Sequence, residues 1–194
     1  MELFDYLPKF KDWLMCASID GTGDIVEFIR KGIVWDEWLA NFKKGLAAPG
    51  GKDKMLFDLT ITGPGMFSIK DLFDLSLELD VRIETKIMFA FHADIVFSPF
   101  AWPKHILNRH LDELLAYIEP KATPKQQTLV NTLKGMKDRQ TFAEQWPDTH
   151  EEQFFNGRNY QEQLDRIRQE QFRLEDIYKR DPELYEWWTR QKKN

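Results

Sequence analysis

Residues 14–32 read LMCASIDGTGDIVEFIRKG, and this stretch decides the fold. Its first six residues, 14–19, form a short apolar run, which is typical of a strand buried on both faces of a parallel sheet. Asp20-Gly21 then favours a turn, and residues 22–24 offer side chains that cap a helix. Apolar residues recur at helical spacing from Ile25 until Gly32 stops the pattern. The stretch therefore predicts one strand–loop–helix unit.

The same unit recurs along the next ninety or so positions. Further helices are expected at residues 35–46, from Ser68 to Leu79 and from 104 to Pro120, and extended segments at 55–62, 81–91 and 94–98, with a short helix at 4–13. Strands that alternate with helices favour parallel pairing through right-handed crossovers. We therefore expect an α/β domain over residues 1–120.

Residues 121–194 have a different character. Gln, Glu, Lys and Arg dominate, and Leu164, Ile167, Phe172 and Leu174 offer only a thin apolar stripe. We expect a peripheral helical extension, 121–194, in which Phe154, Phe155, Trp187 and Trp188 pack back onto the first domain or, alternatively, form a surface for a partner.

Composition narrows the function. A formal net charge of -5 over 194 residues argues against nucleic-acid binding as the main role, which needs a clustered basic surface. No apolar run approaches a membrane span, and the start lacks a signal-peptide core, so we expect a cytoplasmic protein without a membrane partner. The single cysteine, Cys16, cannot build a multi-cysteine metal site, and we interpret it as a small buried apolar residue.

Polar side chains gather after the first strand. Ser18, Asp20, Thr22 and Asp24 lie where α/β proteins hold ligands, because the next helix directs its N–H groups there. Arg30, two turns along that helix, could grip a carboxylate with its guanidinium. A simpler interpretation is a capped turn with Arg30 paired to Glu27.

A family resemblance covers these same residues. The Ser18-Ile19-Asp20-Gly21 strand end, Arg30 twelve residues after the serine, Gly32 and the helix from Trp35 resemble the fourth strand and helix of radical S-adenosylmethionine enzymes. Residues 59–62 are similar to the fifth strand. Residues 95–103, 164–168 and 182–184 resemble the sixth strand and closing helices of the subgroup with a shortened "twitch" extension.

The resemblance implies a half barrel. It implies the C-terminal half of a partial parallel (β/α) barrel, with Ser18, Asp20 and Arg30 contacting S-adenosylmethionine and Thr62 near its adenosyl group. The family's C-x-x-x-C-x-x-C motif is missing, as is its glycine-rich second-strand motif. A [4Fe-4S] cluster would therefore have to come from a partner half, and no catalytic or metal-binding residue is assigned to this chain.

Three hypotheses follow. In the first, a separately encoded N-terminal half carries the cluster and the two pieces form an enzyme that cleaves S-adenosylmethionine to a 5'-deoxyadenosyl radical, with a peptide or protein as a candidate substrate. In the second, the chain is a non-catalytic relic or accessory module that binds a protein or peptide. The third is a truncated reading frame without independent function.

Two other clusters of polar residues give weaker evidence of a functional site. His105 and His110, five residues apart, do not share a helix face, and no carboxylate completes a metal site. Asp71, Asp74 and Glu78 fit a solvated helix face.

Overall fold

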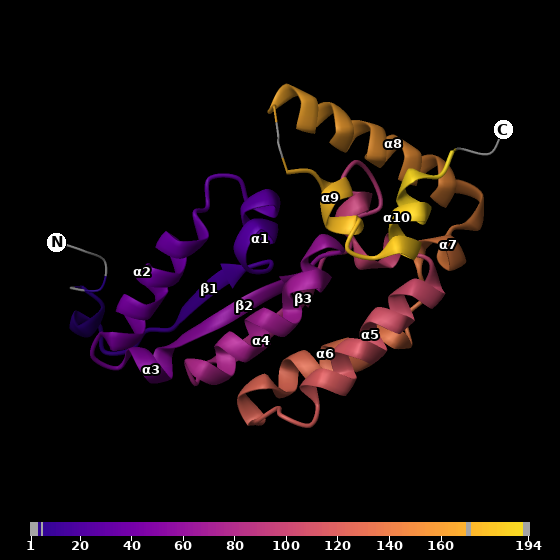
Figure 1. Cartoon of the computed structure of the whole chain (residues 1–194). Helices are drawn as coiled ribbons and strands as arrows, with labels where there is room; N and C mark the ends of the chain where they lie inside the picture. The colour runs from indigo at the N-terminus through magenta and orange to yellow at the C-terminus, as the bar shows by residue number, and fades with distance from the viewer. Residues whose placement is uncertain (1–3, 5, 170–171, 192–194) are drawn as a thin grey trace.

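The chain folds around a small parallel sheet. The computed structural model describes residue 4, residues 6–169 and residues 172–191. Strands β1 (Met15–Ile19), β2 (Met55–Ile61) and β3 (Arg82–Ile87) are parallel and lie in the order β1-β2-β3 (Figure 1). This confirms the expected α/β class with a parallel sheet.

Helices make up most of the remaining structure. Those that connect and follow the strands are α1 (Gly23–Ile29), α2 (Trp35–Ala47), α3 (Gly51–Lys54), α4 (Ile69–Glu78), α5 (Lys104–Ile118) and α6 (Gln127–Lys137). The last part of the described chain adds α7 (Phe142–Gln145), α8 (Pro147–Ile167), α9 (Leu174–Tyr178) and α10 (Pro182–Thr189). Short 3-10 helices are η2 (Leu7–Lys9), η3 (Pro64–Ser68), η4 (Ile95–Phe97), η5 (Pro99–Ala101) and η6 (Pro124–Gln126).

One face of the sheet carries the core. Successive side chains of a strand point to opposite faces, and the odd-numbered positions of β2 are all buried. The rings of Trp38 and Phe42 from α2 pack on Phe57, with centroids 6.1 and 4.6 Å away. From α6, Thr132 Oγ1 lies 2.6 Å from Thr85 Oγ1 of β3. The helices α2 and α6 therefore cover the same face.

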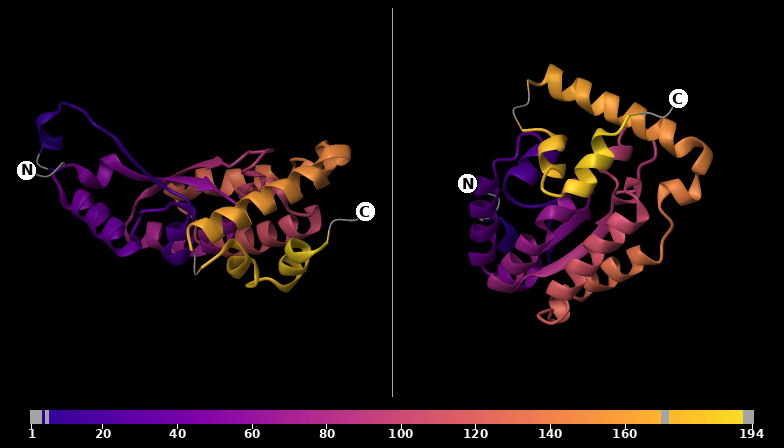
Figure 2. Two further views of the ribbon diagram at one scale, coloured as in Figure 1. Left: turned by 90° about the horizontal axis from the view of Figure 1, so that it is seen from above. Right: turned by 45° about the vertical axis from the view of Figure 1, so that its right-hand side comes forward.

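The opposite face is polar and open. Among its even-numbered positions Cys16 and Lys86 are exposed and Ser18, Asp58 and Glu84 are half-buried, although Leu56 is buried. The expectation that strand 14–19 is buried on both faces was wrong, as was the interpretation of Cys16 as a buried residue. Strands that follow one another in a single direction through right-handed crossovers place their helices on one side. In the left view of Figure 2 the strands run along one side of the molecule, with violet and magenta helices beneath them.

The segment after β3 departs from the sequence prediction. Residues 94–98 were expected to be extended but form η4, which leads into η5. Ser98 begins η5, because its hydroxyl accepts from Phe100 N–H at 3.3 Å, and it ties this turn to the end of β3 by donating to Met88 O at 2.8 Å. The run predicted at 81–91 is a strand only over 82–87, since β2 ends at Ile61, which pairs with Ile87.

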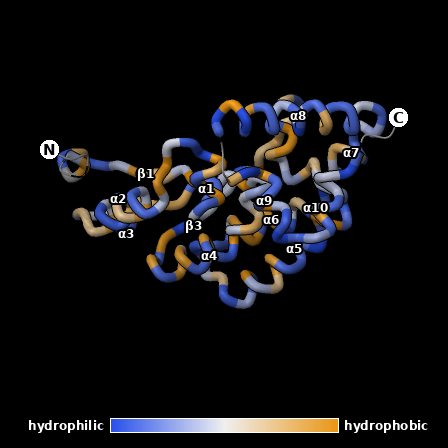
Figure 3. The backbone as a smooth tube through the Cα atoms, turned by 45° about the horizontal axis from the view of Figure 1, so that its top comes forward, coloured by the Kyte–Doolittle hydropathy of each residue, from blue (hydrophilic) through white to orange (hydrophobic). Residues whose placement is uncertain are grey.

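The C-terminal helices belong to the core. Residues after 121 are helical, as predicted, but they are not peripheral, because Phe142, Phe154 and Tyr178 are fully buried. Phe155 and Trp188 are also buried, which confirms that the tail packs back onto the rest of the chain. The helix α8 is largely hydrophilic in Figure 3, yet it approaches η4 so closely that a Cβ at Gly157 would clash with Ile95.

Two further predictions concern the N-terminal segment and membrane spans. The helix expected at 4–13 includes residue 5, which lies outside the described residues, and the described part of that segment holds 3-10 structure, including η2, in place of an α-helix. In the described part of the chain, no helix has the length and apolarity needed to cross a membrane.

Candidate functional site

The open face of the sheet holds a hydroxyl, a carboxylate and an ammonium group side by side. Ser18 and Asp58 are register partners on β1 and β2, and Ser18 Oγ donates to Asp58 Oδ2 at 3.1 Å. Lys86 Nζ of β3 donates to the same oxygen at 2.7 Å. The three strands therefore each contribute one polar group to a continuous row across the sheet.

This arrangement changes the acidity of Asp58. The hydrogen bond from Lys86 is the main cause that holds the pKa of Asp58 below its ordinary value, and the Ser18 hydroxyl and the charges of Lys86 and Arg30 act in the same direction. Partial burial opposes them. Asp58 is consequently a carboxylate at neutral pH, and it is suited to accept hydrogen bonds or to neutralise a cation.

Asp20 and Arg30 form a second polar pair at the end of β1. Asp20 is buried, and its two carboxylate oxygens accept hydrogen bonds from Arg30 Nε and, at 3.3 Å, from Arg30 Nη2. Glu27, the alternative partner for Arg30, instead accepts the Trp35 N–H at 2.8 Å. The simpler interpretation of an Arg30–Glu27 pair was therefore wrong.

The structure places only some of the four predicted site residues, Ser18, Asp20, Arg30 and Thr62, in contact with one another. No hydrogen bond joins Ser18 to Arg30 within the described residues, but the Arg30 charge acts on Asp58, the partner of Ser18. Thr62 is buried and accepts the Gly65 N–H at 2.9 Å. A Cβ at Gly65 would meet both the Thr62 hydroxyl and the Asp20 carbonyl, so Thr62 lies beside Asp20 but uses its hydroxyl in the turn into η3.

Asp58 and Lys86 were missed in the sequence. The signal that could have found them is the alternation of polar and apolar residues in FDLTI (57–61) and RIETKI (82–87). Such alternation, which is complete in 57–61 and interrupted at Thr85 in 82–87, is typical of a sheet with one solvated face. Asp58, Thr60, Glu84 and Lys86 occupy the solvated positions of that pattern.

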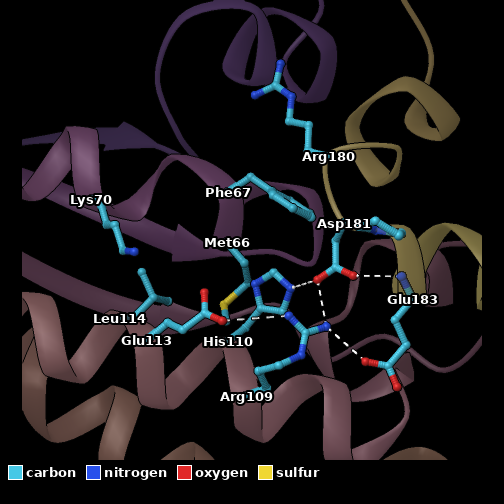
Figure 4. Close-up of a pocket in the computed structure, with 11 residues that line it drawn as sticks. Met66, Phe67, Lys70, Arg109, His110, Glu113, Leu114, Arg180, Asp181 and Glu183 are labelled. Carbon is cyan, nitrogen blue, oxygen red and sulfur yellow. Dashed lines mark hydrogen bonds and ion pairs between the residues drawn. The ribbon is translucent and has the colours of Figure 1, made fainter.

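A pocket lies on the helical side of the molecule, between α5 and the start of α10. It has a volume of about 460 Å³ and is lined by residues of η3, α4, α5 and 180–183. At its wall Asp181 Oδ2 lies 2.6 Å from His110 Nε2 and accepts from Arg109 Nη2 at 2.8 Å (Figure 4). Arg109 also reaches Glu183 at 3.1 Å.

Asp181, Arg109, His110 and Glu183 link α5 to α10, and we call this cluster the Asp181 clasp. Asp181 caps α10, because Oδ1 accepts the N–H groups of Glu183 and Leu184, both at 3.0 Å. Burial by itself raises the pKa of Asp181, but the Leu184 N–H, Arg109 and His110 together hold it below its ordinary value. In Figure 4 the Arg180 side chain points away from this cluster, and it pairs with Asp24 at 2.6 Å. The donors and acceptors thus satisfy one another, which suits a structural role.

Comparison with protein-family models, with curated proteins and with solved structures finds no match for this chain. Over the residues that the structure describes, no group of three or more His, Cys, Asp or Glu side chains is arranged to hold a metal ion.

Proposed function

We propose that this chain forms the C-terminal half of a partial parallel (β/α) barrel of the radical S-adenosylmethionine type. The observation that carries the proposal is the sheet, in which three parallel strands follow in chain order with helices on one face and polar side chains on the other. An open parallel sheet is unusual, because its two faces are normally both covered. In a closed or partial barrel the uncovered face would line the interior.

The polar groups suit a zwitterionic amino-acid ligand. S-adenosylmethionine presents an amine, a carboxylate, a sulfonium and a ribose diol. The Asp58 carboxylate can neutralise a cationic group, and Ser18 Oγ can serve a hydroxyl or an amine. Arg30 uses Nε and Nη2 on Asp20, and its Nη1 retains donors for a ligand carboxylate.

The residues of this chain do not fit an iron–sulfur cluster. A site-differentiated cluster of this family needs three thiolates, and the chain has one cysteine, Cys16, which is exposed on β1. The proposal therefore places the cluster on a separate N-terminal half, and no chemical step through it is assigned to these residues.

The edge of β1 offers a place for that half. Asp58 of β2 lies opposite Ser18, and alternate peptide groups of a strand point in opposite directions. The Met88 N–H bonds to Ile61 O, so odd positions of β2 face β3 and even positions face β1. Because Asp58 pairs with Ser18, the peptide groups of the odd positions of β1 face β2 in turn. The peptide groups of Cys16 and Ser18 therefore point away from β2, where a further strand could pair with them.

Calorimetric titration with S-adenosylmethionine tests the proposal. We expect the full chain to bind it, alone or after co-expression with a cluster-bearing half and anaerobic reconstitution. Arg30→Ala should weaken binding by at least about tenfold, since a charge-assisted pair to the ligand carboxylate is lost. Arg139→Ala, which changes an exposed arginine just after α6, is the control and should bind like the parent. Absence of binding, of a complex and of cofactor cleavage would refute it.

The alternative is a non-catalytic module that binds a peptide or protein. It expects a stable monomer without affinity for S-adenosylmethionine. A groove beside β3, at the other edge of the sheet, favours it.

A further inference from the structure

The outer edge of β3 is unpaired. Because the Met88 N–H bonds to Ile61 O at 2.9 Å, even-numbered positions of β3 direct their peptide groups to β2. The peptide groups of Thr85 and Ile87 therefore point away from the sheet. Within the described residues no hydrogen bond satisfies them. Such an edge is a ready template for another extended chain.

A groove lies along this edge. It has a volume of about 470 Å³ and is lined by Thr85, Lys86, Ile87, Thr128, Asn131, Thr132, Gly135 and Arg139, from β3 and from α6 or the residues just after it. Hydroxyl and amide groups dominate the lining. In Figure 1 α6 lies on the β3 side of the sheet, so the groove has a strand edge as one wall and a helix as the other.

The charges of the lining have one sign. Arg139 is an exposed cation, Lys86 is exposed but its Nζ already donates to Asp58 at 2.7 Å, and no Asp or Glu lines the groove. The α6 helix starts beside the beginning of β3, since Gln126 Nε2 bonds to Val81 O, and reaches Thr85 at Thr132. Arg139 therefore lies toward the carboxyl end of β3. The exposed ring of Phe89, just beyond that end, offers an apolar contact.

Gly135 lines the groove and lies beside open space. A Cβ built at this glycine would meet no atom within 4 Å, and the residue is exposed. Gly135 lies in the last turn of α6, where Ala favours the helix over Gly by up to about 1 kcal/mol.

We infer that the free edge of β3 and the facing side of α6 bind an extended acidic peptide, which adds to the sheet as a fourth strand. Main-chain hydrogen bonds to Thr85 and Ile87 supply affinity, and Arg139 selects carboxylate side chains. The inference does not rest on the proposed function, because a complementary half barrel would pair with β1, at the opposite edge.

Selection of short random peptides displayed on phage, with the full chain as bait, tests this inference. We expect enrichment of acidic sequences. The synthetic peptide most enriched, labelled with a fluorophore, is then titrated by fluorescence polarisation against the parent chain and three variants.

The variants separate groove binding from other effects. Gly135→Leu fills the groove and should weaken binding at least about tenfold. Gly135→Ala improves the helix without filling the groove, so it should bind like the parent. Arg139→Glu should abolish the preference for the acidic peptide over its lysine counterpart. Thermal unfolding of each variant verifies folding.

Two results would overturn the inference. If no peptide is enriched, or if the selected peptide binds Gly135→Leu and Gly135→Ala with equal affinity, the inference is overturned. Titration with S-adenosylmethionine is unaffected by these variants if the inference holds, so the two proposals fail independently.

Discussion

Tyr178 shows how one buried hydroxyl ties distant segments together. Its O–H donates to Val96 O at 3.1 Å and accepts from Trp102 Nε1 at 3.3 Å, so α9 is joined to the two turns after β3. Full burial raises the pKa of its phenol far above the ordinary value, which keeps the hydroxyl protonated and able to donate.

Tyr178→Phe should lower the free energy of unfolding by about 1–3 kcal/mol, because it leaves Val96 O without its donor and Trp102 Nε1 without its acceptor in a dry interior. Urea unfolding measures this. Tyr160→Phe is the control, since Tyr160 is exposed and should change the free energy of unfolding little. Equal effects of the two substitutions would show that the Tyr178 hydroxyl is not needed.

The row Ser18–Asp58–Lys86 makes a prediction about pH. The folded-state pKa of Asp58 is depressed below 3.8, so the row stabilises the protein fully above the unfolded pKa and loses this contribution as pH falls through the lower, folded value. Lys86→Met should raise the pKa of Asp58 more than Ser18→Ala does, because the Lys86 hydrogen bond is the largest cause of the shift. Carboxyl-carbon NMR titration of Asp58 in both variants gives the order, and the opposite order would contradict the assignment.

At the scale of elements, α5 and α10 are held by the Asp181 clasp. Hydrophobic spacing alone predicts α5, and its His110 and Arg109 then meet the cap of a helix seventy residues later. A short helix such as α10 has little stability of its own, so its cap and its packing decide whether it forms.

Asp181→Ala should lower the free energy of unfolding by about 2 kcal/mol or more, since it removes a helix cap and leaves His110 and Arg109 without their shared partner. Chemical denaturation followed by circular dichroism measures the loss. Asp148→Ala, in the first turn of α8, serves as control because Asp148 is exposed and caps nothing. A loss no greater than that of the control would contradict the clasp.

For the whole molecule, the two edges of the sheet have different roles in the two proposals. Cys16 lies on the open face at the β1 edge and its side chain is exposed. It is therefore a natural reporter of assembly through that edge.

Cys16 should react readily with a thiol reagent in the isolated chain and slowly in a complex with a cluster-bearing half, because a new strand would cover it. Mass spectrometry of alkylated protein over time measures the rate. Adding the acidic peptide of the β3 groove is the matched control and should leave the rate unchanged. Unaltered reactivity in the complex would place the contact elsewhere.

Local patterns in the sequence determined most of the elements. The apolar run before Asp20, the periodicity of residues 35–46 and 104–117, and the breaks at Gly32 and Pro120 fix strands and helices through neighbours in the chain, so β1, α2 and α5 were predictable. The strand end with Ser18, Asp20 and Arg30 was found in the same way, because all three lie within one strand–loop–helix unit.

Tertiary structure decided the rest. Asp58 and Lys86 meet Ser18 only through the register of the three strands. Arg30 pairs with Asp20 instead of Glu27 because of how the helix packs at the strand end. The solvation of one sheet face, the 3-10 turns at 95–101 and the burial of the C-terminal aromatics all depend on contacts between residues far apart in sequence. Such contacts depend on which elements meet in space, and periodicity along the chain carries no record of that.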